Sequence, residues 1–307
     1  MKTLSLCIPT FNRSDFLSDL FESLTFNSSK DFELIIVDNC STDNTFETVC
    51  NFKKKLNIQY FLNEKNMGVN YSVKKIIKNA NGKYIWIIGD DEILYKNSID
   101  FIIKMLGQEL PDLVSLNFDY KKINSSYVNS EAEKINFDKT NFEDLTNKSY
   151  SPQNILNTFF SSLILSKKII NLIDFKKITD NVWQNEYSIF PISSQLPEIN
   201  NKINFSCLYV ENPLFLARLH KKNWSDKLHR IKTEILPNLL NIYSNSNSNT
   251  YEMIKIGLLK MSIKSIIKNP KNLKLNIKFF KNNIFNKYLY LSLVNIINEK
   301  ITLYNRN

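Results

Sequence analysis

Glycine, histidine and cysteine are scarce in this chain, whose 307 residues include 5 Gly, 2 His and 4 Cys. No G-x-G-x-x-G follows the first apolar run, which excludes a dinucleotide-dependent dehydrogenase of the Rossmann type. The cysteines form no C-x-x-C pair and have no histidine nearby, which argues against a structural zinc site. Their pattern favours a reduced, cytosolic compartment over a disulfide-stabilised secreted domain.

Long uncharged stretches are also missing. No window of about 20 residues is free of charge, so we expect no membrane-spanning helix. The first apolar run, Leu4–Pro9, is too short for a signal-peptide core and lacks a small-residue cleavage site. With 43% hydrophobic and 12% aromatic residues, the chain can still bury a large core. We expect a cytoplasmic protein with one large domain, or one domain and a smaller appendage.

The positive charge is concentrated at the C-terminal end. Residues 251–307 contain 11 Lys or Arg against 2 Glu, whereas the first 250 residues contain 29 basic and 28 acidic groups. A basic chain raises the possibility of a nucleic-acid binder. The confinement of the charge to the end of the chain, without an RNA- or DNA-binding signature, argues against that function.

Apolar runs and amphipathic stretches alternate through the first 110 residues or so. We predict strands over 3–9, 32–37, 58–62 and 84–88. Helices are expected between them, the first with Ser14 as its N-cap, and another follows over 97–106. Continuous apolar strands joined by helices are typical of a parallel sheet that is covered on both faces. In such α/β sheets, ligands gather at the carboxyl ends of the strands.

The rest of the chain is less regular. We predict strands over 113–119 and 159–165, separated by a polar excursion or mobile loop over 121–150. The expected catalytic domain is 1–242, with a nucleotide-sugar half over about 1–118 and an acceptor half over about 119–242. A low-complexity linker at 243–250 separates it from a basic, amphipathic helical segment over 251–307.

One stretch, YIWIIGDDEIL at 84–94, places three carboxylates directly after a buried strand. One interpretation is a loop that caps the next helix, because acidic residues favour helix N-termini. However, Asp38 ends another strand 52 residues before Asp90, and the two strand ends should meet at one edge of the sheet. Adjacent carboxylates repel unless a cation neutralises them, and a divalent cation that also binds diphosphate oxygens would do so.

Four segments in order resemble the motifs of family-2 glycosyltransferases with a GT-A fold. They are SLCIPTFNR at 5–13, IIVDNCSTDNT at 35–45, NEKNMG at 63–68 and WIIGDDEIL at 86–94. The last is especially similar to bacterial enzymes of the O-antigen and surface-polysaccharide type, including the abequosyltransferase-like group. The resemblance covers residues 3–118 well and continues less clearly through FFSSLILSKKI at 159–169 and ARLHKKNWS at 217–225.

The resemblance implies a role for each matched residue. Pro9, Thr10 and Asn12 would line the nucleotide pocket, Phe11 would lie beside the base, and Asn66, in the third motif, would also bind the nucleotide sugar. Asp38 would accept a hydrogen bond from a pyrimidine. Asp90 would face the ribose, and Asp91 would hold Mn²⁺ or Mg²⁺ on the diphosphate. The sequence has Asp-Asp-Glu where the family has Asp-x-Asp, so Glu92 is a further candidate for the metal.

Inverting members of this family use a downstream Asp or Glu to take the proton of the acceptor hydroxyl. Glu186 in DNVWQNEYSIF is the best match and Asp180 the second; both are equally typical of solvated loop acids. His220, within RLHKKNW, would lie in a cationic loop that closes over the diphosphate, or simply in a basic surface loop. The basic segment over 251–307 either packs on the catalytic domain or adheres to an anionic membrane surface.

We therefore expect a metal-dependent, inverting glycosyltransferase. It would move sugar from a nucleoside-diphosphate sugar, most simply a UDP-sugar, to a glycan or lipid-linked glycan in bacterial surface-polysaccharide synthesis, from the cytoplasm or the inner face of the membrane. The alternative is a catalytically inactive scaffold or binding module of the same fold. A sugar-nucleotide pyrophosphorylase would want a glycine-rich, basic loop where this chain has TFNRSD. No nucleic-acid partner is expected.

Overall fold

The computed structural model describes residues 1–121, 135–148, 160–180 and 191–218, together with scattered residues from 233 onwards. The chain divides into two compact units, residues 1–220 and 221–307. The domain limits that we predicted at 242 and 251 lie outside the described residues and stay predictions.

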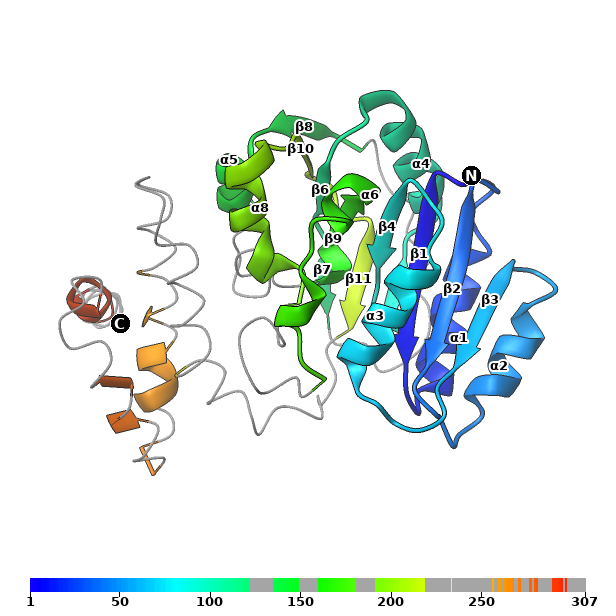
Figure 1. Cartoon of the computed structure of the whole chain (residues 1–307), viewed down its shortest axis with the longest axis horizontal. Helices are drawn as coiled ribbons and strands as arrows, with labels where there is room; N and C mark the ends of the chain where they lie inside the picture. Colours follow the sequence, from blue (N-terminus) through cyan, green and yellow to red (C-terminus); the bar gives the residue numbers. More distant parts are fainter. Residues whose placement is uncertain are drawn as a thin grey trace, which may run out of the picture. The chain divides into compact units, whose positions relative to one another are not determined.

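A mixed, mostly parallel sheet of eight strands forms the centre of the first unit, with the order β3-β2-β1-β4-β9-β6-β10-β8 (Figure 1). The pairs β1–β2, β2–β3, β1–β4 and β6–β10 are parallel, whereas β9 and β8 are antiparallel to their neighbours. The strands are β1 Leu4–Thr10, β2 Phe32–Asp38, β3 Ile58–Leu62, β4 Tyr84–Ile87, β6 Leu113–Leu116, β8 Phe137–Thr140, β9 Leu163–Ser166 and β10 Cys207–Val210.

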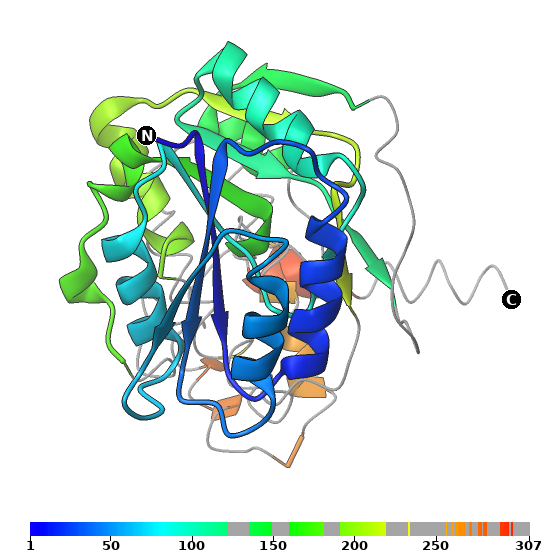
Figure 2. The ribbon, with the colours of Figure 1, turned by 90° about the vertical axis from the view of Figure 1, so that its right-hand side faces the viewer.

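Helices cover both faces of this sheet, as the continuous apolar strands predicted (Figure 2). The helices α1 Ser14–Leu24, α2 Thr45–Phe52 and α4 Ser98–Glu109 pack on one face. The helices α3 Val69–Asn79, α5 Phe142–Lys148, α6 Lys167–Ile170 and α8 Leu196–Ile203 pack on the other. Successive side chains of a strand point to opposite faces, so each buried strand contributes to both cores.

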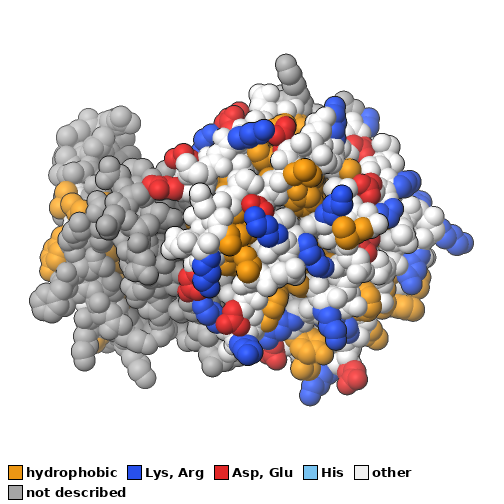
Figure 3. All heavy atoms as spheres, turned by 45° about the horizontal axis from the view of Figure 1, so that its top comes forward, with side chains coloured by type: hydrophobic (Ala, Val, Ile, Leu, Met, Phe, Trp, Pro, Cys, Tyr) orange, Lys and Arg blue, Asp and Glu red, His pale blue; other side chains and the backbone are white. Residues whose placement is uncertain are grey.

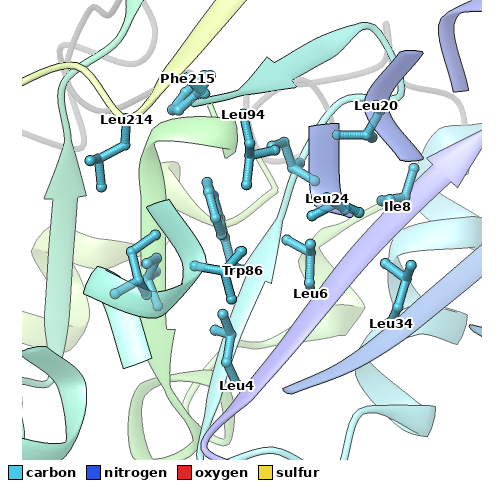
Figure 4. Packing of buried hydrophobic residues seen from close by; sticks show 14 of the residues in the cluster. Leu4, Leu6, Ile8, Leu20, Leu24, Leu34, Trp86, Leu94, Leu214 and Phe215 are labelled. Carbon is cyan, nitrogen blue, oxygen red and sulfur yellow. The ribbon is translucent and has the colours of Figure 1, made fainter. Parts of the chain in front are cut away.

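The first core shows how β4 is anchored (Figure 4). Trp86 of β4 is fully buried beside Leu6 of β1 and lies edge-on to Phe215, with 6.1 Å between the ring centroids. Its indole N–H donates a 2.7 Å hydrogen bond to the backbone oxygen of Ser161. Burying a tryptophan is favourable only when this donor is satisfied. The strand that leads to the acidic cluster is therefore held by apolar packing and one specific hydrogen bond.

A second sheet of three strands, β5-β11-β7, lies beyond the end of β4. It comprises β5 Glu92–Leu94, β7 Asp119–Lys121 and β11 Phe215–Arg218. Our single strand over 113–119 is thus two strands in two sheets. Our polar excursion over 121–150 was wrong in part, since it contains edge strand β8 and helix α5, whose Phe142 and Leu145 are buried.

The described residues of the second unit are mainly helical, in agreement with the predicted helical segment. Leu289 and Ser292 are buried, and the hydroxyl of Ser292 donates to the backbone oxygen of Ile256 at 2.8 Å. Tyr290, Leu291 and Val294 are exposed on the same helical stretch. In the described part of the chain, no helix has the length and apolar character needed to cross a membrane.

Candidate active site

Three strand ends meet where the sequence places its polar clusters. Thr10 and Asp38 are register partners at the ends of β1 and β2. On the other side of β1, the N–H of Ile88 donates to the backbone oxygen of Cys7 at 2.9 Å and so extends the β1–β4 pairing towards Gly89. Because parallel strands end at the same edge of a sheet, these residues converge.

Asp90 is a buried acid of this cluster. It is 5% exposed, and one of its oxygens, Oδ2, accepts a 2.8 Å hydrogen bond from the hydroxyl of Thr10. Its other oxygen, Oδ1, lies 2.9 Å from Nη1 of Arg13. Burial raises the pKa of Asp90 to about 6; Arg13 opposes this rise, and the neighbouring Asp91 adds to it. At neutral pH, Asp90 therefore carries a charge that has little contact with water.

Asp91 shares the same arginine. Its Oδ2 lies 3.1 Å from Arg13 Nη1, so one guanidinium nitrogen bridges two adjacent carboxylates. Gly89 allows this arrangement. A Cβ on Gly89 would lie 2.7 Å from Asp91 Oδ1 and 3.1 Å from Glu92 Oε1. With a side chain at position 89, the Asp91 carboxylate could not keep its present position.

Glu92 occupies a different environment from Asp90 and Asp91. It belongs to β5, is 3% exposed, and accepts a 3.3 Å hydrogen bond from the hydroxyl of Ser161. The same hydroxyl accepts the backbone N–H of Gly89 at 3.0 Å. Ser161, which the sequence gave no reason to single out, thus joins Glu92 to the turn before Asp90. A role for Glu92 as a metal ligand stays a prediction.

Asp38 is held by neutral donors. It is 1% exposed; Tyr60 of β3 donates to its Oδ2 at 2.6 Å, and the backbone N–H of Ser41 donates to its Oδ1 at 2.8 Å. Burial, the hydrogen bond and the charge of Asp38 together raise the pKa of the Tyr60 hydroxyl, so this phenol remains a donor. The carboxylate is fixed in orientation and retains lone pairs for a further donor.

The loop after β1 forms one wall of the site. Asn12 has a left-handed backbone, with φ of 52°, and its side-chain oxygen accepts the N–H of Thr42 at 2.7 Å. Pro9 is half-buried within β1, whereas Phe11 is 39% exposed at the edge of the cluster. An exposed aromatic ring beside buried polar groups is suited to stacking on a flat ligand.

Ser14 does not cap the helix as we predicted. Helix α1 begins at Ser14 itself, with Arg13 at the N-cap position and no side-chain capping bond there. The backbone N–H of Ser14 instead donates to Oδ2 of Asp43 at 2.9 Å. An acid from the loop after β2 therefore satisfies a donor at this helix N-terminus.

Asn66 helps to build the loop between β3 and α3. Its side-chain oxygen accepts the amide of Asn39 at 2.7 Å and the N–H of Gly68 at 3.1 Å. Asn39 in turn accepts from Asn63 at 3.1 Å. These amides tie the ends of β2 and β3 together beside Asp38, and direct binding of a nucleotide by Asn66 stays a prediction.

Arg218, at the end of β11, supports Asp91 from the backbone side. Its Nε donates to the backbone oxygen of Asp91 at 2.6 Å, its Nη1 pairs with Asp19 at 2.6 Å, and its Nη2 donates to the backbone oxygen of Phe16 at 3.1 Å. Its Cζ also lies 4.9 Å from the centre of the Phe16 ring. The sequence placed Arg218 only in a basic loop, because nothing local indicates a contact with residues 127 positions away.

Of the two candidates for the catalytic base, only Asp180 lies among the described residues. Asp180 is half-exposed and forms a 3.3 Å ion pair with Lys74 of α3. Its backbone oxygen lies near Gly68, so it belongs to the side of the site formed by α3. Glu186 and His220 lie outside the described residues. The identity of the base stays a prediction.

The carboxylate pair fits a divalent cation. Its oxygens are hard ligands, and the structure already places a cationic nitrogen within 3.1 Å of both acids. Among the described residues, no group of three or more His, Cys, Asp or Glu is arranged to hold a metal. A cation at this pair would need further oxygens, such as those of a diphosphate, and metal binding by Asp90 or Asp91 stays a prediction.

Comparison with protein families agrees with the motifs. The model described as "Glycosyl transferase family 2" matches residues 5–170, more than half of the chain. An uncharacterized glycosyltransferase of Rickettsia felis is 33% identical over 129 residues, which cover 41% of this chain and 21% of that protein. Abequosyltransferase RfbV of Salmonella typhimurium is 30% identical over 184 residues, 56% of this chain and 55% of that protein. The matches thus span between a fifth and about half of these relatives.

Solved structures share the fold at low identity. TarS 1–349 of S. aureus in complex with UDP-GlcNAc has a TM-score of 0.59 at 16% identity, covering 86% of this chain and 73% of that one. Mannosyltransferase PcManGT from Pyrobaculum calidifontis, in complex with GDP-Man and Mn²⁺, has a TM-score of 0.58 at 10% identity, covering 99% and 88%. Both support the assignment of the central sheet and its helices to a GT-A type of fold.

Proposed function

Because this chain belongs to glycosyl transferase family 2, we propose that it transfers a sugar from a nucleoside-diphosphate sugar to a glycan or lipid-linked glycan. The observation that carries the proposal is the pair Asp90–Asp91 at the end of β4, beside Thr10 and Asp38 and bridged by Arg13. Buried acids and an exposed aromatic ring at the carboxyl edge of an α/β sheet suit a nucleotide that carries a diphosphate.

In this proposal each described group has a task. Asp38 accepts an N–H of the base, Asp90 binds the ribose, and Phe11 stacks beside the base. Asp91 holds Mn²⁺ or Mg²⁺, which when bound would stabilise the negative charge of the leaving diphosphate. Glu186, or Asp180 after it leaves Lys74, takes the proton of the acceptor hydroxyl in an inverting transfer.

We take the donor to be a UDP-sugar, since Asp38 is set up to accept a hydrogen bond and uracil carries an N–H donor where cytosine has an acceptor. TarS was solved with UDP-GlcNAc and PcManGT with GDP-Man, so relatives of this fold bind different nucleotides. Calorimetric titration with UDP, GDP, CDP and dTDP, with and without Mn²⁺, tests the choice. Tight binding of UDP and dTDP only, dependent on Mn²⁺, is expected.

The matched variants for this titration are Asp91→Asn and Glu22→Gln. Both remove one carboxylate charge, but Glu22 is an exposed residue of helix α1. Asp91→Asn should abolish the metal-dependent part of binding and Glu22→Gln should leave it unchanged. If no nucleotide binds the unmodified protein with or without Mn²⁺, the transferase proposal is wrong and the inactive scaffold replaces it.

The second unit suggests where the acceptor is met. Tyr290, Leu291 and Val294 present an exposed apolar face on a segment whose whole length, 251–307, carries a net charge of +9. Such a surface suits the cytoplasmic face of an anionic membrane, where each lysine near the surface contributes about 1 kcal/mol.

On the viewed face of the first unit, acidic and basic side chains are interspersed, unlike a nucleic-acid footprint (Figure 3).

Sedimentation with lipid vesicles tests this surface. The protein should sediment with vesicles that contain anionic lipid and remain in solution with neutral ones. Leu291→Asp with Val294→Asp should abolish sedimentation without changing nucleotide affinity. Equal sedimentation of the variant and the unmodified protein would assign this face to another role.

A further inference from the structure

Two arginines contact Asp91, and they differ in how completely they are held. Arg218 uses Nε, Nη1 and Nη2 in separate hydrogen bonds to Asp91, Asp19 and Phe16, and its side chain is 9% exposed. Arg13 contacts both carboxylates through Nη1, its Cζ lies 5.8 Å from the centre of the Phe16 ring, and its side chain is 27% exposed. Arg218 is thus held through all three guanidinium nitrogens, whereas Arg13 is more exposed and is held to the acids through one nitrogen, so it needs to give up fewer hydrogen bonds to turn.

The position of Arg13 is also the position that a metal would take. Its Nη1 is 2.9 Å from Asp90 Oδ1 and 3.1 Å from Asp91 Oδ2, so a cation held by Asp91 would have to share or replace the contact between Asp91 and Arg13. Arg13 and a divalent cation therefore compete for the same carboxylate oxygens. Two cations beside one carboxylate repel each other, so a cation on Asp91 favours movement of Arg13 away from that residue.

We propose that Arg13 is an exchangeable counter-ion, which holds Asp90 and Asp91 in the free protein and releases Asp91 to the divalent cation when a nucleoside diphosphate binds. This inference rests on the proposed function. After release, the guanidinium keeps its contact with Asp90 and turns Nη2 and Nε to the diphosphate, for which a planar fork of donors is well suited.

Charge balance explains why the exchange would be useful. In the free protein, one guanidinium offsets one of two carboxylates, which limits repulsion at a largely buried site. A divalent cation that arrives with the doubly charged diphosphate of a sugar nucleotide adds no net charge, so Arg13 is still needed beside the assembled ligand; a free nucleoside diphosphate carries more negative charge and needs Arg13 more. A cation without a diphosphate must displace Arg13 with nothing to receive it. The site would therefore retain metal only together with the donor.

The test compares binding of Mn²⁺ alone with binding of UDP in saturating Mn²⁺, by titration calorimetry and by the EPR signal of free Mn²⁺. Arg13→Gln removes the competing cation, so Mn²⁺ alone should bind about tenfold tighter or more. UDP should bind about tenfold weaker, because the diphosphate loses a charged donor. If Arg13 had only a structural role, Arg13→Gln would bind both Mn²⁺ and UDP more weakly.

Arg13→Lys serves if Arg13→Gln does not fold. The lysine keeps the charge, so the affinity for Mn²⁺ alone should stay near that of the unmodified protein, while UDP binding weakens because an ammonium offers no fork. Asp91→Asn defines the Mn²⁺ signal that belongs to this site. A folded Arg13→Gln that binds Mn²⁺ alone no more tightly than the unmodified protein would overturn the exchange.

The proposed function and this inference fail in different ways. If the unmodified protein binds no nucleotide with Mn²⁺, the function is wrong. If UDP binds in a metal-dependent manner but Arg13→Gln changes the two affinities in the same direction, the function stands and the exchange is wrong.

Discussion

Asp38 and Asp90 end the two strands that flank β1, and both are nearly fully buried, yet the protein neutralises them differently. Asp38 receives two neutral donors, the Tyr60 hydroxyl and the Ser41 N–H. Asp90 receives the Thr10 hydroxyl and a guanidinium that it shares with Asp91. Neutral donors fix an acceptor in place, whereas a shared guanidinium can be exchanged for another cation.

Under the proposed function, this difference would separate recognition of the base from the chemistry of transfer at one edge of the sheet. The β2 side offers a preorganised acceptor whose geometry does not depend on a ligand, which suits the selection of a base. The β4 side offers charge that is only partly compensated, which suits a cation and a diphosphate that arrive together. Variants that affect one side and leave the other intact test whether this division is real.

The largest effect is expected from removal of the Asp91 carboxylate. Asp91→Asn should lower kcat about a thousandfold or more, because the leaving diphosphate loses its cation. Asp38→Asn should instead raise KM for the donor about tenfold and leave kcat nearly unchanged. Release of nucleoside diphosphate from the sugar nucleotide measures both. Equal losses of kcat in the two variants would mean that the two sides do not divide recognition from chemistry.

The second effect concerns pH and stability. The pKa of Asp90 is raised from 3.8 to about 6, so between these values the native state binds more protons than the unfolded state. Ionising Asp90 therefore lowers the free energy of unfolding as pH rises from about 4 to about 6, by about 3 kcal/mol in all. Asp90→Asn should lack this loss.

Urea titrations of both proteins at pH 4.5 and 7.5, in chelator, measure this difference. The variant should gain stability relative to the unmodified protein at pH 7.5 and much less at pH 4.5. A constant difference across pH would show that Asp90 is ionised throughout, with Arg13 fully compensating its burial.

The sequence predicted the first four strands closely and placed the acids at the correct edge of the sheet. Strands β1, β2 and β4 are buried on both faces, so their apolar runs are continuous and their ends are abrupt. Strand β3 lies at the sheet edge and is only half-buried, but its sequence IQYFL is still mostly apolar. Edge strand β8, by contrast, reads FDKT and is only half-buried. It carries no comparable pattern, so the segment over 121–150 resembled a loop.

The contacts that organise the candidate site could not be predicted in the same way. Arg13 meets Asp90 across 77 positions and Arg218 meets Asp91 across 127. The first pairing exists because the central sheet places the ends of β1 and β4 side by side, and the second because β11 of the small sheet pairs with β5, which follows Asp91. Arg13 lies in the motif TFNR, which follows a predicted strand whose end should meet the acidic cluster. Its positive charge could therefore have indicated an ion pair with that cluster. Nothing in the sequence indicated the contacts of Tyr60 and Ser161. Neither residue lies in a recognised motif or beside a charged cluster.

A smaller effect is expected when the Asp91 carboxylate is displaced but kept. In Gly89→Ala, the new Cβ would lie 2.7 Å from Asp91 Oδ1, so the carboxylate must turn away from its present position. Mn²⁺-dependent nucleotide binding should weaken about tenfold, since ligand geometry is strict. Gly107→Ala is the control, because no atom lies within 4 Å of its added Cβ in helix α4. It should stabilise the protein by about 0.5–1 kcal/mol and leave binding unchanged.

The smallest effect should come from Tyr60→Phe, which removes one of the two donors to Asp38 and keeps the ring that contacts Phe46 at 5.6 Å between centroids. The carboxylate remains held by Ser41, so nucleotide affinity should fall only about threefold and stability by about 1 kcal/mol. Metal affinity should not change, because the β4 side is untouched. Calorimetry with UDP at saturating Mn²⁺ measures the first effect and a titration with Mn²⁺ alone the last. A change in Mn²⁺ affinity in this variant would mean that Asp38 and Asp91 are coupled through β1. Base recognition and cation binding would then be only partly separate.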